Sequence, residues 1–199
     1  MASTSQDITA LLHAVREGDR EALDRLFRLV YDELRTIAHA QRRRWTGDET
    51  MGTTAIVHEA YLKLAGVNHL EADDRSHFFT LASRAMRQIL LNYARDRKAK
   101  KRGGGRVEVS LDTPPLIGDL DEAAADRLIA LDRALEELEG ISGRPVRVVE
   151  CRFFAGLTVA ETAEALGISA ATVKRDWAHA STWLRRRLEG ERAGPGPAP

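Results

Sequence analysis

Apolar residues recur at helical spacing along almost the whole chain. Near its start the spacing is i, i+3, i+4 and i+7, set by Ile8, Leu11, Leu12 and Val15. The same kind of periodicity returns in residues 23–37, 56–64, 79–93, 128–138, 146–153 and 173–184. The alternation of apolar and polar residues that marks a half-buried strand is suggested only by residues 106–111. The sequence therefore predicts an all-α fold.

Capping and breaking residues predict where several of these helices begin and end. Asp19 is a candidate N-cap for one long helix that continues to Arg44, and residues 47–52 form a break with a glycine at each end. The next helix is predicted to begin at Thr53 or Thr54, because a threonine side chain can accept a hydrogen bond from a free N–H of the first turn.

Charge is segregated along the chain, although it has 30 basic and 30 acidic residues in total. Residues 1–106 carry 19 basic and 14 acidic side chains, residues 107–139 carry 2 and 10, and residues 140–199 carry 9 and 6. A net charge of zero therefore does not exclude a nucleic-acid partner. We predict two small helical domains, residues 5–103 and 123–189, an acidic flexible linker, residues 104–122, and a disordered Gly/Pro/Ala-rich tail, residues 190–199.

Residues 157–184 have the pattern of a helix-turn-helix. Thr158 and Glu161 are spaced as a capping box, Gly167 suits the turn, and Ser169 can cap a second helix. That helix would bury Val173, Trp177, Ala180 and Leu184. Its outer face would present the candidate DNA contacts Ser169, Thr172, Lys174, Arg175 and His179, since polar side chains read base edges and cations pair with phosphates. The alternative is a helical hairpin with a solvated charged face.

A second basic element lies in residues 84–106, which hold nine basic side chains and one acidic side chain. A charge run alone is more often a solvated face than a site. Here polar side chains continue along one helix face, opposite an apolar face that includes Met86 and Leu90. They are Arg84, Arg87, Gln88, Asn92 and Arg95. Because guanidinium groups hold phosphates and amides read base edges, this face is a second candidate DNA contact.

With these motifs, the chain resembles the extracytoplasmic-function sigma factors of bacterial RNA polymerase over residues 5–190. Leu166 to Ser169, followed by Thr172 to Lys174, is close to the terminal motif of that family. Met86-Arg87-Gln88, then Asn92 and Arg95, is similar to its pattern on the helix that recognises the minus-ten element. Residues 57–62 resemble the helix that docks on the polymerase clamp, which would make His58, Glu59, Tyr61 and Leu62 docking residues.

The resemblance implies an alternative sigma factor that acts in the cytoplasm with core RNA polymerase and promoter DNA. The N-terminal domain would dock on the beta-prime clamp and melt the promoter, with residues 67–79 and the basic helix capturing the minus-ten region. Within this segment the candidates to capture a base are residues 68–77, Phe78 and Phe79. Either aromatic side chain could instead belong to the core, and for Phe79 the core is favoured. The C-terminal domain would bind the beta flap and place its second helix at the minus-thirty-five element. The acidic linker would thread the polymerase, and an anti-sigma factor is a candidate partner.

One departure from the family concerns the residues before the clamp-docking helix. Family members usually have acidic residues there, but this chain has Gly52, Thr53, Thr54 and Ala55. A phosphate on Thr53 or Thr54 would restore negative charge at a helix N-terminus, where the helix dipole favours it. Both threonines are therefore candidate targets of a Ser/Thr kinase. The competing interpretation is that they only cap the helix.

Other classes of protein are less consistent with the sequence. The six histidines show no metal-ligand spacing and no glycine-rich loop has the phosphate-binding pattern, so we expect no enzyme, catalytic residue, metal or cofactor. No apolar run is long enough to cross a membrane, and no secretory signal is recognised at the start of the chain. The single cysteine, Cys151, is expected to be buried. An autonomous helix-turn-helix transcriptional regulator remains the alternative function.

Overall fold

The computed structural model describes residues 5–46, 51–66, 72–102 and 122–192, and every regular element in these ranges is helical. The predicted all-α class is confirmed. The elements are α1 (Ser5–Arg16), α2 (Arg20–Leu29), α3 (Tyr31–Thr46), α4 (Met51–Ala65), α5 (Arg75–Arg102), α6 (Glu122–Ile141), α7 (Gly143–Val149), the π-helical segment η1 (Glu150–Phe154), α8 (Val159–Leu166) and α9 (Ala170–Arg192).

The long helix predicted from Asp19 to Arg44 is divided in two. Asp19 does cap its start, because its Oδ1 accepts the Ala22 N–H at 3.0 Å. The chain then leaves the helical conformation at Val30, where φ is −105° and ψ is 11°, and α3 begins at the next residue. Val30 is fully buried. The apolar periodicity runs through this position without a glycine or proline, so the break carries no local sequence signal.

Two other helix ends differ from the prediction. The helix α4 begins at Met51, so Thr53 and Thr54 lie within its first turn and do not precede it as caps. The helix α9 continues to Arg192, although the tail was predicted to start at residue 190. The predicted linker lies almost wholly in residues 103–121, and the rest of the tail in residues 193–199; both ranges are outside the described residues.

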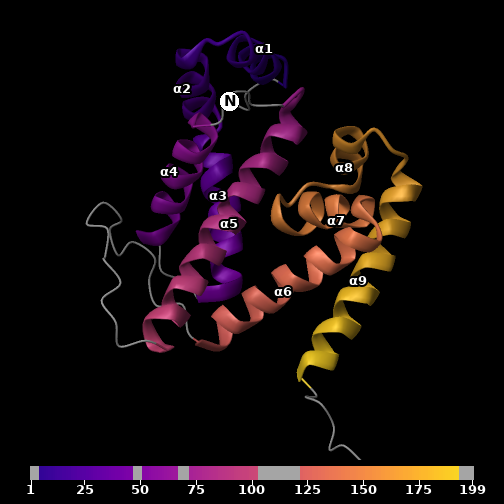
Figure 1. Ribbon diagram of the computed structural model, residues 1–199. Coiled ribbons are helices and arrows are strands. Elements are labelled where there is room, and N and C mark those ends of the chain that lie inside the picture. The colour runs from indigo at the N-terminus through magenta and orange to yellow at the C-terminus, as the bar shows by residue number, and fades with distance from the viewer. Residues whose placement is uncertain (1–4, 47–50, 67–71, 103–121, 193–199) are drawn as a thin grey trace, which may run out of the picture.

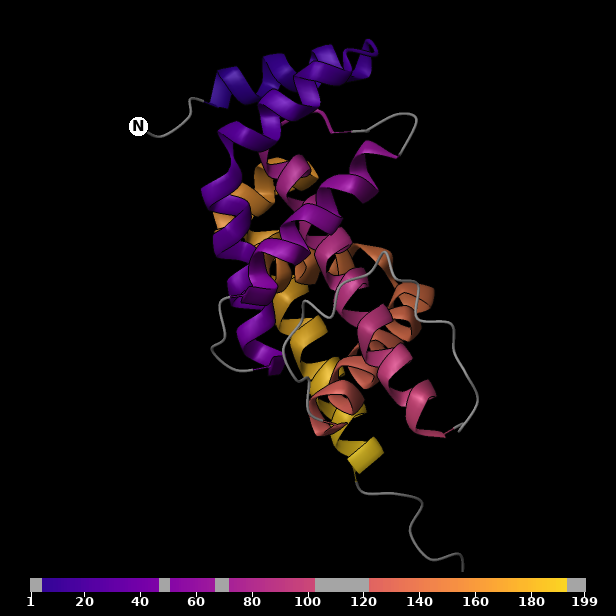
Figure 2. The ribbon, with the colours of Figure 1, turned by 90° about the vertical axis from the view of Figure 1, so that its left-hand side faces the viewer.

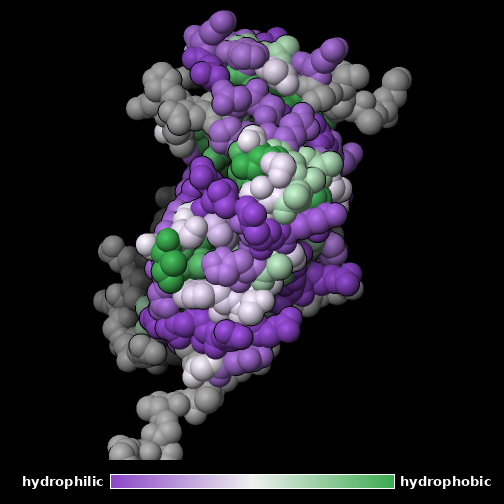
Figure 3. Space-filling model, turned by 90° about the vertical axis from the view of Figure 1, so that its right-hand side faces the viewer, coloured by the Kyte–Doolittle hydropathy of each residue, from purple (hydrophilic) through white to green (hydrophobic). Residues whose placement is uncertain are grey.

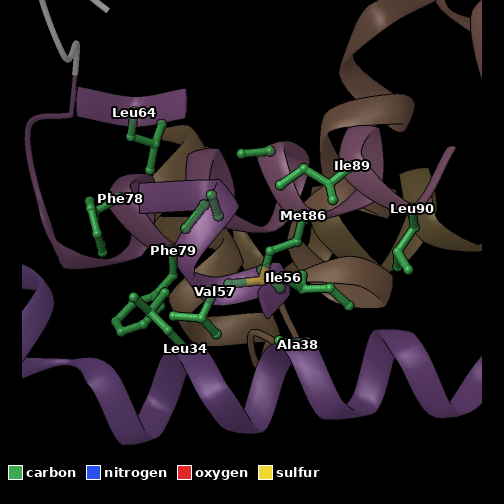
Figure 4. Packing of buried hydrophobic residues seen from close by; sticks show 14 of the residues in the cluster. Leu34, Ala38, Ile56, Val57, Leu64, Phe78, Phe79, Met86, Ile89 and Leu90 are labelled. Carbon is green, nitrogen blue, oxygen red and sulfur yellow. The ribbon is translucent and has the colours of Figure 1, made fainter. Parts of the chain in front are cut away.

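The main core surrounds α5, the longest helix (Figures 1 and 4). Its apolar side is buried as predicted, with Met86 fully enclosed and Leu90 1% exposed. Phe78 and Phe79, in its first turn, are buried too, and their rings pack edge to face with centroids 5.6 Å apart. The expectation that Phe79 belongs to the core is therefore confirmed. Phe78 points into the same core and is not available for base capture in this structure.

The core built around α5 extends into the C-terminal half of the chain. Ala124, Ala125 and Leu128 of α6, together with Cys151 of η1, are buried in the same cluster as the N-terminal helices. A second, smaller cluster joins α6, α7, η1 and α9. Figure 1 shows α6 crossing from the end of α5 towards α7, and Figure 2 shows the N-terminal helices in front of α9. The C-terminal half therefore lies against α5 in the structure.

Candidate nucleic-acid interface

The turn between α8 and α9 is built by the residues that the sequence singled out. Thr158 donates its backbone N–H to Glu161 Oε2 at 2.7 Å, and the Glu161 N–H donates to Thr158 Oγ1 at 3.2 Å, which completes the capping box. Hydrogen bonding of the Glu161 carboxylate to the backbone N–H of Thr158, and also to its side chain, lowers the pKa of Glu161. At the other end of α8, Gly167 takes the left-handed conformation with φ of 62°. The predicted helix-turn-helix is therefore present.

The second helix of this motif, α9, starts on a side-chain cap. Ser169 Oγ accepts the Thr172 N–H at 3.1 Å, so one free N–H of the first turn is satisfied. Three of the four residues predicted on the inner face are buried: Val173 and Ala180 are fully enclosed and Leu184 is 8% exposed. The fourth, Trp177, is only partly buried and packs against the same cluster. Burial of this face fixes which side chains of α9 point outwards.

The outward side of α9 starts at Ser169, and we call it the recognition face; it comprises Ser169, Thr172, Lys174, Arg175 and His179. Thr172 is partly buried and the other four are exposed. Arg175 lies 4.0 Å from Asp176, which is already held by Arg144 at 2.5 Å. Figure 3 shows mainly hydrophilic side chains on the side of the molecule that includes α9. The recognition face is open to a ligand.

The second candidate contact, the polar face of α5, is partly covered. It comprises Arg84, Arg87, Gln88, Asn92 and Arg95, of which Arg84, Asn92 and Arg95 are exposed and Gln88 is half-buried. Arg87, which the sequence placed on an outward face, is only 6% exposed. Its guanidinium donates to Asp132 at 3.0 Å and to Glu150 at 3.2 Å. The correction follows from tertiary packing, because both acceptors come from the C-terminal half.

The same two carboxylates contact other arginines of α5. Arg84 lies 3.4 Å from Glu150, and Arg95 lies 3.2 Å from Asp132. Burial raises the pKa of both carboxyl groups, and the nearby guanidinium groups oppose that rise. Asp132 and Glu150 were missed as members of the site. The sequence offers one signal that could have identified them: each is an acidic residue that lies beside apolar residues of a helix.

The predicted clamp-docking residues lie on α4. His58 and Leu62 are exposed, and Glu59 and Tyr61 are half-buried. The Tyr61 hydroxyl donates to Asp24 at 2.5 Å, which holds the tyrosine against α2. Burial raises the pKa of Glu59, and the charge of His58 opposes that rise. Along one side of α4 runs an open groove of about 660 Å³, lined by residues that include Thr54, His58 and Tyr61.

The two candidate phosphorylation sites differ in exposure. Thr54 is exposed on the groove, but Thr53 is 1% exposed and its hydroxyl has no hydrogen-bond partner in the structure. A kinase cannot reach a side chain that is enclosed in this way. Thr53 is therefore withdrawn as a candidate for the folded chain, and Thr54 is kept.

The predicted capture segment is only partly within the described residues. Residues 67–71 of the predicted capture segment lie outside the described residues, and residues 72–79 lead into α5. Among the described residues there is no group of histidine, cysteine and acidic side chains that could hold a metal ion. No helix in the described ranges is both long and apolar enough to cross a membrane.

Comparisons with known proteins place this arrangement in a family. The family described as "ECF sigma factor" matches residues 5–190 of the chain. A similar protein is the ECF RNA polymerase sigma factor SigK of Mycobacterium ulcerans (strain Agy99), which is 25% identical over 194 residues and covers 93% of this chain and 95% of its own. No solved structure matches the chain.

Proposed function

The chain belongs to the ECF sigma factor family, so we propose which of its helices bind promoter DNA. As a member of that family it is an alternative sigma factor that directs transcription initiation. Its partners are core RNA polymerase and promoter DNA. The open recognition face of α9 would bind the minus-thirty-five element, and the polar face of α5 would bind the minus-ten region. The action is binding and strand separation, in which no residue of the chain is catalytic.

The observation that carries the proposal for α9 is the exposure of Lys174, Arg175 and His179 on a helix whose opposite side is buried. A recognition helix needs a fixed orientation, so that polar side chains at its N-terminal end reach base edges while cations pair with phosphates. The capping box and the Ser169 cap supply that orientation.

For α5, the proposal depends on the series of guanidinium and amide groups on one face of a single helix. The amides of Gln88 and Asn92 can hydrogen-bond exposed base edges, while Arg84 and Arg95 can hold the backbone. Capture of unstacked bases by such groups offsets the cost of strand separation. We place the beta-prime clamp on α4, around His58, Glu59, Tyr61 and Leu62, and the beta flap on the C-terminal half. The site of action would be the cytoplasm, where the polymerase works.

The proposal is tested by transcription with purified core polymerase. A promoter that depends on this chain can be found by sequencing the RNA made after its overexpression. We expect specific transcripts from that promoter only when the chain and core polymerase are both present. Tight binding of the duplex promoter by the chain alone, with no transcription on addition of core polymerase, would instead identify an autonomous helix-turn-helix regulator.

The role of the recognition face is tested in the same holoenzyme with the substitution Lys174→Ala/Arg175→Ala. Loss of two phosphate contacts should weaken promoter binding and reduce the slope of log affinity against log salt concentration by about 1 to 2. Arg133→Ala, which removes an exposed arginine from α6, is the control and should leave the slope unchanged. An unchanged slope in the double variant would mean that the two cations do not face phosphate.

A further inference from the structure

An acidic side chain, Asp176, lies on the buried side of the recognition helix α9. It is 4% exposed, and it falls between Val173 and Ala180, which are fully enclosed on the same side of the helix. Removing a carboxylate from water is costly unless another group compensates its charge. Here the compensating group comes from another helix: it is Arg144, in the first turn of α7.

Arg144 holds both oxygens of this carboxylate. Its Nε donates to Asp176 Oδ2 at 2.5 Å, and its Nη2 donates to Oδ1 at 3.3 Å. This two-point geometry matches a guanidinium to a carboxylate. Figure 1 shows α7 beside α9, so the pair ties the recognition helix to a helix that precedes the helix-turn-helix. The helix dipole disfavours a cation in a first turn, and Asp176 offsets that effect for Arg144.

Arg175 of the recognition face competes for the same carboxylate. Its Nε lies 4.0 Å from Asp176 Oδ1, the oxygen that Arg144 holds by the longer of its two hydrogen bonds. The Arg175 side chain is 72% exposed, so packing does not prevent its rotation. A movement of about 1 Å would turn this approach into a hydrogen bond. Only the occupation of the carboxylate by Arg144 opposes that movement.

Another cation that faces α9 is already engaged. Arg152 donates to the Leu157 carbonyl at 2.8 Å, and its guanidinium lies 5.8 Å from the centre of the Trp177 ring. Among the described residues, Arg144 and Arg175 are the cations within 4.0 Å of Asp176. Loss of Arg144 would therefore leave Arg175 as the nearest partner of a buried carboxylate.

The net charge of these three groups depends on Arg144. Two guanidinium groups and one carboxylate leave one positive charge, which is the exposed charge of Arg175. Without Arg144 the sum is zero. Carboxylate and phosphate oxygens accept hydrogen bonds from the same guanidinium donors, so a pair between Arg175 and Asp176 would remove a contact to DNA.

We propose that Arg144 is a positioning residue for promoter binding: by holding Asp176, it keeps Arg175 available to a phosphate of the minus-thirty-five element. Arg144 acts through the other two side chains and does not itself contact DNA. This inference rests on the proposed function of the recognition face of α9. Its consequence is that promoter binding depends on Arg144 only while the chain has a carboxylate at position 176.

The test is a mutant cycle measured in the holoenzyme, on the promoter duplex found by RNA sequencing. The variants are Arg144→Gln, Asp176→Asn and the two combined. In Arg144→Gln, Arg175 turns to Asp176, so promoter affinity should fall roughly tenfold. The slope of log affinity against log salt concentration should fall by about 1, which corresponds to one phosphate contact. Asp176→Asn should keep the native slope, because Arg175 then has no carboxylate to bind.

The combined variant decides between the proposal and its alternatives. It has no carboxylate to capture Arg175, so affinity and slope should return to the native values although Arg144 is absent. If Arg144 contacts phosphate directly, or only supports the fold, the combined variant stays as weak as Arg144→Gln. That result would overturn the proposal.

A second measurement follows Arg175 itself. Arg175→Ala should lower the slope by about 1 in the native chain. Added to Arg144→Gln it should have little further effect, because that phosphate contact is already lost. Equal losses in the two backgrounds would show that Arg175 faces phosphate without help from Arg144, and the proposal would be wrong.

The matched control is Arg147→Gln. It removes an exposed cation from the same helix, α7, and leaves the pair of Arg144 and Asp176 intact. Affinity and slope should stay native. If this control lowers the slope as much as Arg144→Gln does, loss of any cation from α7 explains the effect, and the proposal is refuted.

The outcomes also separate this inference from the proposed function. If Arg144→Gln loses helix content by circular dichroism, the combined variant decides alone, because it leaves no buried charge unpaired: a native slope supports the proposal and a reduced slope overturns it. If Lys174→Ala/Arg175→Ala leaves the slope unchanged, the proposed function of the recognition face fails, and this inference with it. If that variant lowers the slope and Arg144→Gln does not, only this inference fails.

Discussion

At the scale of single residues, the exposure of a side chain decides whether it can act in the way its type suggests. Arg87 and Lys174 are both cations on helices with an apolar side, yet Arg87 is enclosed between two carboxylates and Lys174 is exposed. Thr53 and Thr54 are neighbours of the same type, and only Thr54 reaches the surface. Helical geometry alone explains the second contrast, because successive residues point about 100° apart.

The exposure of Thr54 leads to a prediction about regulation. A phosphate here would lie in the first turn of α4, where the helix dipole favours negative charge, and on the groove beside His58. We expect Thr54→Asp to raise promoter activity in cells several-fold and Thr54→Ala to lower it. Thr53→Ser, which keeps the buried hydroxyl, is the control. Reporter output that is the same for all three variants would show that Thr54 is not a switch.

At the scale of elements, the helix-turn-helix follows its local sequence closely. Each signal in residues 157–184 is a contact between near neighbours: the capping box spans three residues, the turn needs one glycine, and Ser169 caps the helix that follows. Such contacts are determined by the local sequence, and the structure therefore contains them where they were predicted. The break at Val30 depends on the packing of a buried side chain and was missed.

The capping box makes a prediction about stability and its dependence on pH. Thr158→Ala should lower the free energy of unfolding by about 1 kcal/mol, the usual cost of losing an N-cap. The Glu161 carboxylate has a lowered pKa in the folded chain, so its stabilising effect is present above its ordinary pKa of 4.5 and is lost as the pH falls through the lowered value. Urea titrations at several pH values should show the difference between the native chain and Glu161→Gln shrinking below pH 4.5. Glu164→Gln, exposed on the same helix, is the control.

At the scale of the whole molecule, the important feature is a core shared between the two halves. Leu128 belongs to α6 but packs in the cluster built around α5, whereas Leu138, later in the same helix, packs in the smaller cluster with α7 and α9. The contact between the halves therefore has an apolar contribution in addition to the ion pairs of Arg87.

The two leucines give a matched pair of substitutions. Leu128→Ala and Leu138→Ala both remove buried atoms, since these side chains are 1% and 0% exposed, and each should cost about 2 to 5 kcal/mol. We expect Leu128→Ala to accelerate amide hydrogen exchange in α5 as well as α6, because it weakens the contact between the halves. Leu138→Ala should accelerate exchange in α6, α7 and α9 and leave α5 protected. Equal protection of α5 in both variants would contradict a shared core.

The sequence by itself determined the all-α class, the apolar side of the helices, the caps Asp19, Thr158 and Ser169, and the outward face of α9. These features depend on periodicity and on contacts within a few residues, so they can be predicted from the sequence alone. Only the tertiary structure decided that Val30 ends α2, that Thr53 is buried and that Asp132 and Glu150 enclose Arg87. The ion pairs of Arg87 join residues 45 and 63 positions apart. The sequence shows which residues are charged, but the packing of the helices determines which of them form ion pairs. Burial of apolar side chains drives that packing and so sets the distances between charged groups.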